Sequence, residues 1–409
     1  MDAAPIPPRI LAMWALAAST FLYAFLQRVS PSVMVEDLMR GFGVGGTVLG
    51  NLSAFYLYAY ALLQIPLGVM FDRFGVRRLM AASLLVSGAG SLLFAVAPSV
   101  EIAYLGRLLI GGGAACSFVG ALTVTALWLP PARFALFAGL VQLLGMAGAI
   151  FGQAPLAALV AWLGWRGALA AMALLAAAMA VALHLALREK PRPPGTQLRV
   201  GEAMRAVLAV RETWTCAIFG FAMTGPMLAF GGLWAVPYLT TVYGLPRTTA
   251  AALTSLIFAG WGLGAPLIGW ISDRLGRRRA PMAVCAAISG TLLAAIVFGP
   301  VWPVWILAIL LGLQGLTAAA MVLGFAVVKE RNAAGSAAFA MAVVNTFVVG
   351  SGALLQPLIG WLLDRSWTGT LADGARIYDG AAYGAALATL PPLFVIALLA
   401  CAATRERPR

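Results

Sequence analysis

GVMFDRFGVRR, at residues 68–78, recurs 201 positions later as GWISDRLGRRR, at residues 269–279. Each copy follows one long apolar stretch and precedes another. Both copies carry glycines, one acid and several arginines in the same register, a pattern typical of a short loop between two membrane spans. A loop repeated at the same point of two apolar halves indicates a duplicated membrane protein.

The composition points the same way. The chain is 62% hydrophobic and 10% charged, with a mean hydropathy of +0.94. A soluble globule with this balance would expose more apolar surface than water tolerates. Apolar stretches of about 20 residues recur from end to end, each long enough to cross ~30 Å of hydrocarbon as a helix. The short alternating segments of a transmembrane β-barrel are not seen, so the predicted class is an all-α polytopic membrane protein.

Twelve spans fit the apolar stretches, and one polar linker separates them into two groups of six. We expect an N-terminal six-helix bundle over residues 1–187, a cytoplasmic linker over 188–212 and a C-terminal six-helix bundle over 213–409. These would form two pseudosymmetric bundles, with substrate bound between them near the bilayer midplane. The spans are expected at residues 10–30, 48–70, 79–97, 101–128, 135–160, 166–187, 213–242, 248–271, 281–300, 303–329, 334–363 and 380–403.

The net charge of +13 is explained by membrane topology and does not indicate binding to nucleic acid. Of the 27 Lys and Arg residues, 20 fall on the two ends and one set of alternate loops. The positive-inside rule then places both termini in the cytoplasm, with the lipid bilayer as the protein's surroundings. Arginine greatly outnumbers lysine, which we interpret as the codon bias of a GC-rich bacterial genome, and we expect the bacterial inner membrane.

No cofactor or metal is predicted. The four cysteines (Cys116, Cys216, Cys285 and Cys401) are dispersed through apolar segments without metal-ligand spacing. No phosphate-binding Gly-x4-Gly-Lys-Ser/Thr loop is found, which argues against ATP-driven transport by this chain. One histidine and no acid inside a span leave little from which to build a hydrolase.

The residue types of the repeated loop each have a physical role. Gly68 and Gly269 precede the acid by one helical turn, where a neighbouring helix can come close. Gly75 and Gly276 permit a positive φ in a tight connection. The acids, Asp72 and Asp273, can accept hydrogen bonds from arginines or from a helix N-terminus.

Both loops resemble the signature of the major facilitator superfamily, which lies between helices two and three and again between eight and nine. The resemblance covers the whole chain. In that family the acid and arginines form a cytoplasmic latch that stabilises the outward-facing state, and the usual state is a monomer. The resemblance therefore implies a gating role for Gly68, Asp72, Arg73, Gly75, Arg77 and Arg78, and for their counterparts Gly269, Asp273, Arg274, Gly276 and Arg278.

A second family pattern, Arg-x3-Gly-x-Gly in helix four, is matched by Arg107, Gly111 and Gly113. The segments 23–33 and 53–66 are similar to the anion:cation symporter branch. There the helix-one arginine, matched by Arg28, binds anionic substrates, and the helix-two tyrosine, matched by Tyr60, lines the site. The sequence departs from that branch at two positions, where Ser30 replaces an asparagine and Ala114 replaces the acid used in proton coupling. The helix-five signature of drug antiporters is not matched.

Arg28 and Arg107 are the only cations clearly within spans. Each costs about 2.5–3.5 kcal/mol at a helix centre, so such residues face a cavity or a partner. Because neither has an evident acidic partner in the sequence, we expect an acidic group of the substrate to pair with them. The predicted substrate-binding residues are Arg28, Tyr56, Tyr60, Gln64, Arg107, Gln142, Trp234, Trp261 and Asn345; Trp261 is the counterpart of Tyr60 by the 201-residue offset.

The sequence therefore predicts a secondary active transporter of a small organic solute, most simply an organic anion, working by alternating access. Transport or export of a neutral or cationic compound, such as a nucleoside, an amino acid or a drug, is an alternative. A membrane solute sensor that does not transport is a further one. No carboxylate is expected at mid-membrane depth, so the sequence leaves the mode of coupling open. Transport could be coupled to a proton or another ion, could be coupled through the substrate's own proton, or could be uniport.

Overall fold

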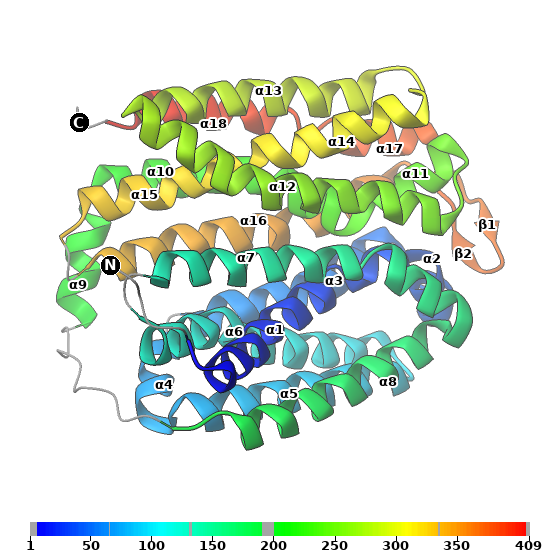
Figure 1. Cartoon of the computed structure of the whole chain (residues 1–409). Coiled ribbons are helices and arrows are strands. Elements are labelled where there is room, and N and C mark those ends of the chain that lie inside the picture. Colours follow the sequence, from blue (N-terminus) through cyan, green and yellow to red (C-terminus); the bar gives the residue numbers. More distant parts are fainter. Residues whose placement is uncertain (1–5, 65, 131–132, 190–199, 334–335, 406–409) are drawn as a thin grey trace.

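The computed structural model describes residues 6–64, 66–130, 133–189, 200–333 and 336–405, and the chain forms two stacked bundles of long helices (Figure 1). The blue-to-green first bundle lies below the green-to-red second one. Both described chain ends lie on the same side, together with α4 and α9, and we call this side the terminal end. The opposite side carries α2 and a two-stranded hairpin, and we call it the hairpin end.

The helices of the first bundle follow the apolar stretches of the sequence. In chain order they are α1 (Pro8–Val29), η1 (Ser30–Val33), α2 (Val35–Phe42), α3 (Gly46–Gln64), α4 (Leu67–Phe74), α5 (Val76–Val96), α6 (Val100–Trp128), α7 (Phe134–Phe151) and α8 (Ala154–Ala186).

Helix α9 (Val200–Leu208) precedes the second bundle. That bundle comprises α10 (Arg211–Pro226), the π-helical η3 (Met227–Trp234), α11 (Ala235–Tyr243), α12 (Arg247–Leu275), α13 (Arg279–Phe298), α14 (Val304–Ala318), η4 (Ala319–Met321), α15 (Val322–Arg331), α16 (Ala337–Arg365), β1 (Leu371–Ala372), β2 (Ala375–Arg376), α17 (Gly380–Leu387) and α18 (Pro392–Ala403).

The predicted helical membrane fold is confirmed. Eleven described helical stretches are long and apolar enough to cross a bilayer, and Leu136–Phe151 is a shorter apolar one. The expected turn between spans five and six lies at Gly164, which has φ 69° and ψ 165° within α8. Because only glycine adopts such a backbone readily, the chain reverses there and returns as span six. The boundaries of the linker at 188–212 stay a prediction, since residues 190–199 lie outside the described residues.

Two local features differ from the expected spans. In span two, α3 ends at Gln64 and α4 begins at Leu67; residue 65 lies outside the described residues, and Pro66, a turn residue, has no N–H to continue a helical hydrogen-bond ladder. The segment between spans one and two was expected to be a loop and instead contains α2. The hairpin β1–β2 pairs Leu371 with Arg376, and it adds one small ladder to an otherwise helical fold.

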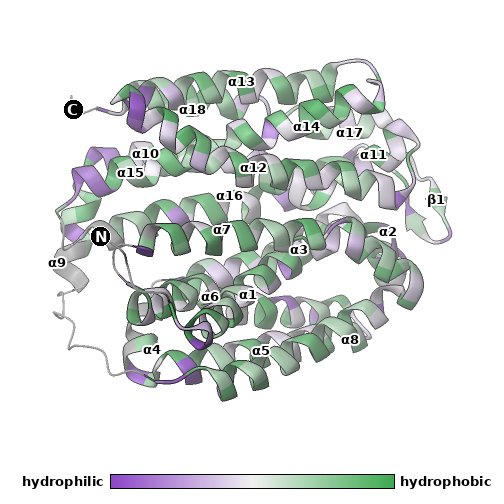
Figure 2. Ribbon diagram, in the orientation of Figure 1, coloured by the Kyte–Doolittle hydropathy of each residue, from purple (hydrophilic) through white to green (hydrophobic). Residues whose placement is uncertain are grey.

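The exterior is suited to lipid. Hydrophobic residues cover the length of the bundles, and hydrophilic residues gather at the two ends (Figure 2). Large apolar side chains on this surface are well exposed, such as Trp162 at 80% and Leu185 at 78%. Hydrocarbon, unlike water, covers such side chains without cost.

The two bundles meet most closely along α3 and α16. Near the hairpin end neither Gly46 nor Gly360 has room for a Cβ, because each would meet the backbone of the other. Further along, the Tyr58 hydroxyl donates to the carbonyl of Ala353 at 3.0 Å. Small residues thus let two helices from different bundles approach to backbone contact, and they close the hairpin end of the molecule.

Candidate functional site

Arg28 lies near the end of α1 among aromatic rings. Its guanidinium carbon is 4.2 Å from the centroid of the Phe25 ring, 4.7 Å from that of Tyr60 and 5.6 Å from that of Tyr56. Its Nε is buried and has no hydrogen-bond partner, and no ion pair of Arg28 is found among the described residues. The ring faces compensate part of the positive charge, and the Nε–H is left without an acceptor.

Arg107 is held very differently. The side chain is fully buried, and its donors reach backbone carbonyls of two other helices: Gln27 at 2.8 Å, Leu52 at 3.2 Å and Ser53 at 3.4 Å. It also lies 5.0 Å from the Tyr56 ring. In this conformation Arg107 binds α1 to α3 and presents no surface to a solute. A substrate contact of Arg107 in another conformation stays a prediction.

The other predicted binding residues fall into two groups. Tyr56 and Trp234 are fully buried; the Tyr56 hydroxyl donates to the carbonyl of Ala24, and the Trp234 indole donates to that of Gln356. The partly exposed ones are Gln64, Gln142 and Asn345. In the described part of the chain no hydrogen bond or ring contact joins Trp234, Gln142 or Asn345 to Arg28.

Trp261 is nearly buried in α12, and its indole N–H has no hydrogen-bond partner among the described residues. Gln314 of α14 is 2% exposed, and both atoms of its amide lack a partner in the same part of the structure. Leaving such a group unsatisfied costs about 1–3 kcal/mol. The second bundle therefore holds polar groups whose hydrogen-bonding capacity is unused in this conformation.

The hairpin end is fastened by the carboxylate of Asp364, at the end of α16. It accepts hydrogen bonds from the backbone N–H groups of Gly46 at 2.9 Å and Thr47 at 2.8 Å, and from the Thr47 hydroxyl at 2.6 Å. Arg376 and the Tyr378 hydroxyl, from its own bundle, donate at 3.1 and 2.6 Å. Asp364 thus caps the N-terminus of a helix in the other bundle, where an anion is favoured.

Two further groups strengthen this closure. Burial and the neighbouring Asp364 carboxylate raise the pKa of Tyr378, so its hydroxyl stays protonated and donates. Arg247, at the start of α12, binds Asp37 at 2.6 Å and Glu36 at 3.7 Å across the two bundles. We call Asp364 with its donors Gly46, Thr47, Arg376 and Tyr378 the hairpin-end lock.

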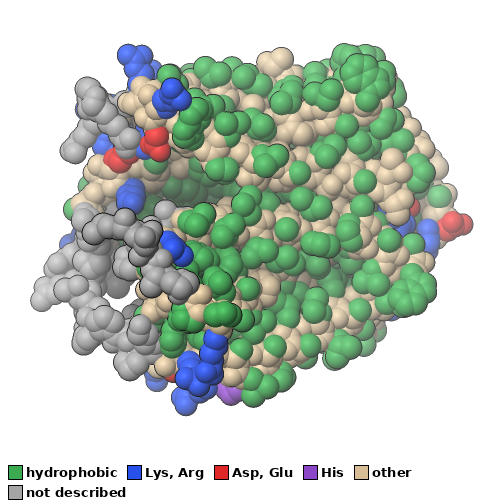
Figure 3. Space-filling model, viewed as in Figure 1, with side chains coloured by type: hydrophobic (Ala, Val, Ile, Leu, Met, Phe, Trp, Pro, Cys, Tyr) green, Lys and Arg blue, Asp and Glu red, His purple; other side chains and the backbone are tan. Residues whose placement is uncertain are grey.

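The terminal end, in contrast, is open between the bundles. Figure 3 shows the surface hollowed between the two halves on this side, with arginines and lysines around it. A Cβ added at Gly139 of α7, Gly269 of α12 or Gly350 of α16 would meet nothing within 4 Å. The close approach expected at Gly269 is therefore not made in this conformation.

The two copies of the repeated loop have distinct contacts. In the first, Gly75 has φ 77° and ψ 161°, and Arg77 lies 3.7 Å from Glu189. Gly68 lies in α4, Arg73 lies over the ring of Phe74, and Arg78 is exposed. The side chain of Asp72 lies outside the described residues.

In the second copy the acid–arginine contact is seen directly. Arg278 lies 2.8 Å from Asp273 and 3.2 Å from Glu330, which links the loop to the end of α15. Gly276 has φ 62°, as its place in a tight connection predicts, and Arg274 lies over the ring of Trp270. The latch role of the two loops stays a proposal, because it concerns the opposite conformation.

Replacing Gly75 with Ala is expected to destabilise the protein by about 1–3 kcal/mol, since an alanine strains this backbone. The new Cβ would also run into the carboxylate of Glu189. Gly269→Ala is the matched control, because Gly269 is helical and has open space for a Cβ. Thermal unfolding in detergent measures both. Equal unfolding temperatures for the two variants would contradict the proposed constraint at Gly75.

Sequence reasoning missed two participants. Phe25 contacts Arg28 more closely than either tyrosine, and its position three residues earlier on the same helix is a signal that points to it. Asp364 is not among the site residues predicted from the sequence. Its partners Gly46 and Thr47 are more than 300 residues away in sequence, and no local pattern reports such a pairing.

Two stacked bundles of membrane-length helices (Figure 1) are typical of membrane transporters. The family model described as the Major Facilitator Superfamily matches residues 16–246 and 227–409, and the chain belongs to this family.

Its relatives include the "Uncharacterized transporter YybO" of Bacillus subtilis, which is 24% identical over 391 residues, covering 88% of this chain and 86% of that one. The "Probable galactarate/D-glucarate transporter GudP" of Pseudomonas putida is 25% identical over 383 residues and covers 83% and 82%. Among solved structures, a bacterial homologue of the human lysosomal transporter Spinster, in an inward-facing and unoccupied conformation, is similar in fold. It has a TM-score of 0.80 and 18% identity, covering 99% of this chain and 100% of that one.

Proposed function

We propose that this protein is a secondary active transporter that carries a small organic anion across the bacterial inner membrane, with Arg28 as the anion-binding group. The observation that carries the proposal is the environment of Arg28. Its guanidinium has the rings of Phe25, Tyr56 and Tyr60 as neighbours, and its buried Nε has no hydrogen-bond partner among the described residues. The described carboxylates all lie at helix ends or in connecting segments, so a substrate acid is the natural partner.

Related proteins support the chemistry. GudP is named for galactarate and D-glucarate, which are hydroxylated dicarboxylates. A substrate of this kind would place one carboxylate on Arg28 by bidentate hydrogen bonds. Its hydroxyl groups would find hydrogen-bond partners at Trp261 and Gln314 of the second bundle, whose hydrogen-bonding capacity is unused.

The direction of opening follows from the charge distribution. With the basic terminal end in the cytoplasm, the conformation described is inward-facing: the hairpin-end lock is closed and the cytoplasmic side is hollow. In the alternative conformation the terminal ends would close through the two latch loops, and the lock would open to admit substrate from outside. The protein would work as a monomer, since each chain contains both halves of the site.

Uptake by purified protein in liposomes tests the proposal. We expect saturable uptake of a radiolabelled sugar dicarboxylate, competed by other hydroxylated dicarboxylates and not by nucleosides. An imposed pH gradient distinguishes cotransport of a proton, including the substrate's own, from uniport. Competition by nucleosides, amino acids or cationic drugs in place of dicarboxylates would rule out an organic anion. Binding without flux would instead identify a sensor.

A further inference from the structure

The seventh span contains a π-helical segment, η3, between α10 and α11. At its end the Ala235 N–H bonds to the carbonyl of Phe230, five residues back instead of the usual four. All eight residues of η3 are buried. π-Helical turns are rare and are found frequently at functional sites. A π-helical segment of this length therefore needs contacts from its surroundings that stabilise it.

Gln356 of α16 supplies two such contacts. Its amide Nε2 donates to the carbonyl of Leu228 at 2.9 Å, and its backbone carbonyl accepts a hydrogen bond from the Trp234 indole at 3.0 Å. Gly232 lies against the same amide, since a Cβ there would be 3.4 Å from Nε2. Because Leu228 and Trp234 lie near the two ends of η3, one residue of α16 fastens the segment at both ends.

The same stretch of α16 also contacts α3 of the first bundle. Pro357 has no N–H, so the carbonyl of Ala353 lacks its helical donor, and the Tyr58 hydroxyl of α3 donates to it at 3.0 Å. A Cβ added at Gly50 of α3 would collide with the backbone of Pro357 and of the residue before it. Residues 353–357 of α16 therefore contact both the other bundle and η3, and we call them the proline stretch.

A change in η3 would alter the contacts between the bundles at the hairpin end. Helix α11 follows η3 directly, and both elements contact η1 of the first bundle. A change from bonding five residues back to bonding four residues back is a shift of one residue, which is about 100° of turn around a helix axis. After such a turn α11 would present a different face to η1.

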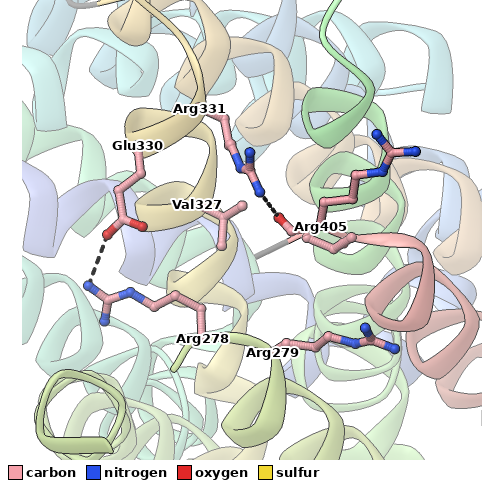
Figure 4. Close-up of a pocket in the computed structure, with 7 residues that line it drawn as sticks. Arg278, Arg279, Val327, Glu330, Arg331 and Arg405 are labelled. Atoms are coloured by element: carbon pink, nitrogen blue, oxygen red, sulfur yellow. Dashed lines mark hydrogen bonds and ion pairs between the residues drawn. The ribbon is translucent and has the colours of Figure 1, made fainter. Parts of the chain in front are cut away.

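Other helices of the second bundle are tied to one another at the terminal end. Glu330 of α15 binds Arg278, at the start of α13, at 3.2 Å, and Arg331 donates to the backbone carbonyl of Arg405, after α18, at 2.6 Å (Figure 4). These contacts lie within one bundle, so they can be kept when the two bundles tilt relative to each other. The change of shape can then fall on the seventh span.

We propose that η3 is a conformational hinge whose π-helical form belongs to the closed hairpin end, and that the proline stretch couples the hinge to this closure. When α3 withdraws, the Tyr58 hydroxyl leaves the carbonyl of Ala353, and Gln356 releases Leu228. The segment then relaxes to an α-helix and turns α11 away from η1. Gln356 is a positioning residue in this device, which is separate from the proposed anion site at Arg28.

The distance between spin labels at Glu101 of α6 and Thr241 of α11 tests the proposal in the full-length protein with its native cysteines replaced. Both positions are exposed at the hairpin end. Gln356→Met keeps an unbranched side chain and removes the amide, and Tyr58→Phe removes only the hydroxyl. Each loses a hydrogen bond between neutral groups and is expected to raise the ratio of open to closed conformations about 2- to 10-fold.

The double variant decides whether the two contacts are coupled. Because both act through the proline stretch, the double variant of Gln356→Met and Tyr58→Phe is expected to shift the ratio little more than either single variant. Shifts that multiply in the double variant would show independent contacts and overturn the coupling. An unchanged distance distribution in Gln356→Met would overturn the hinge role of Gln356.

Tyr104→Phe is the matched control for Tyr58→Phe. The Tyr104 hydroxyl donates to the carbonyl of Val48 at 3.2 Å, which is a contact within the first bundle, so its loss should leave the distance distribution unchanged. If Gln356→Met does not fold, Trp234→Phe removes the other contact between Gln356 and η3 and is held to the same outcomes.

Discussion

Arg28→Gln is expected to weaken binding of the anionic substrate at least about 30-fold and to abolish its saturable uptake, with the fold retained. Removing one partner of a buried charge pair costs about 2–5 kcal/mol. We expect the fold to be retained because Arg28 forms no ion pair among the described residues, and glutamine relieves the insertion cost of the cation. Substrate-induced thermal stabilisation and liposome uptake measure the two effects.

Arg107→Gln is the matched control, since it removes the other arginine within a span. It takes away donors to three backbone carbonyls, so we expect a lower unfolding temperature. Arg28→Lys keeps the charge without the bidentate geometry and should be intermediate in affinity. Undiminished uptake of the substrate by Arg28→Gln would be incompatible with the proposed anion site.

Asp364→Asn is expected to release the hairpin-end lock and to shift the protein toward the conformation that is open on that side. The substitution keeps the size of the side chain but replaces a charged acceptor with an amide, whose NH2 group faces donors. Charge-assisted hydrogen bonds contribute about 1.5–3 kcal/mol, which corresponds to a shift of roughly 10- to 100-fold in the equilibrium.

The shift can be followed by the distance between spin labels at Glu101 and Leu371, which are exposed at the hairpin end of different bundles. The native cysteines are replaced in this background. Asp373→Asn is the control, because Asp373 is an acid at the same end whose side chain is 89% exposed and whose contact with Arg40 of the other bundle, at 4.0 Å, is at the surface, where ion pairs contribute little. We expect a longer distance for Asp364→Asn alone. The same distance distribution in both variants would show that the lock does not hold this conformation.

The sequence predicted those parts of the fold that the bilayer imposes. A span needs about 20 apolar residues wherever it lies, so the helices could be placed before their partners were known. Glycine at a positive φ is also a local requirement, and Gly75 and Gly276 were both expected on that ground. Helix α2 escaped prediction because its short amphipathic stretch has no span-length signal.

The site was less predictable, because its chemistry depends on contacts between distant segments. Arg28 and Arg107 both lie inside spans, so the cost of inserting a charge does not distinguish them. Only the packing of α1, α3 and α6 shows that backbone carbonyls occupy Arg107 while aromatic rings surround Arg28. The same applies to Trp234 and Trp261: the first has a carbonyl partner, and the second has an unused donor.

The composition of the hairpin-end lock has a consequence for how this protein can vary over evolution. Two of the donors to Asp364 are main-chain N–H groups, which any residue except proline supplies. Residue 47 can therefore be substituted with the loss of only one hydrogen bond, that of the Thr47 hydroxyl to Asp364. Position 46 cannot, because a side chain there would collide with the backbone of Gly360. Closure of this end therefore depends on very few positions, chiefly Gly46 and Asp364, which lie in opposite halves of a duplicated chain.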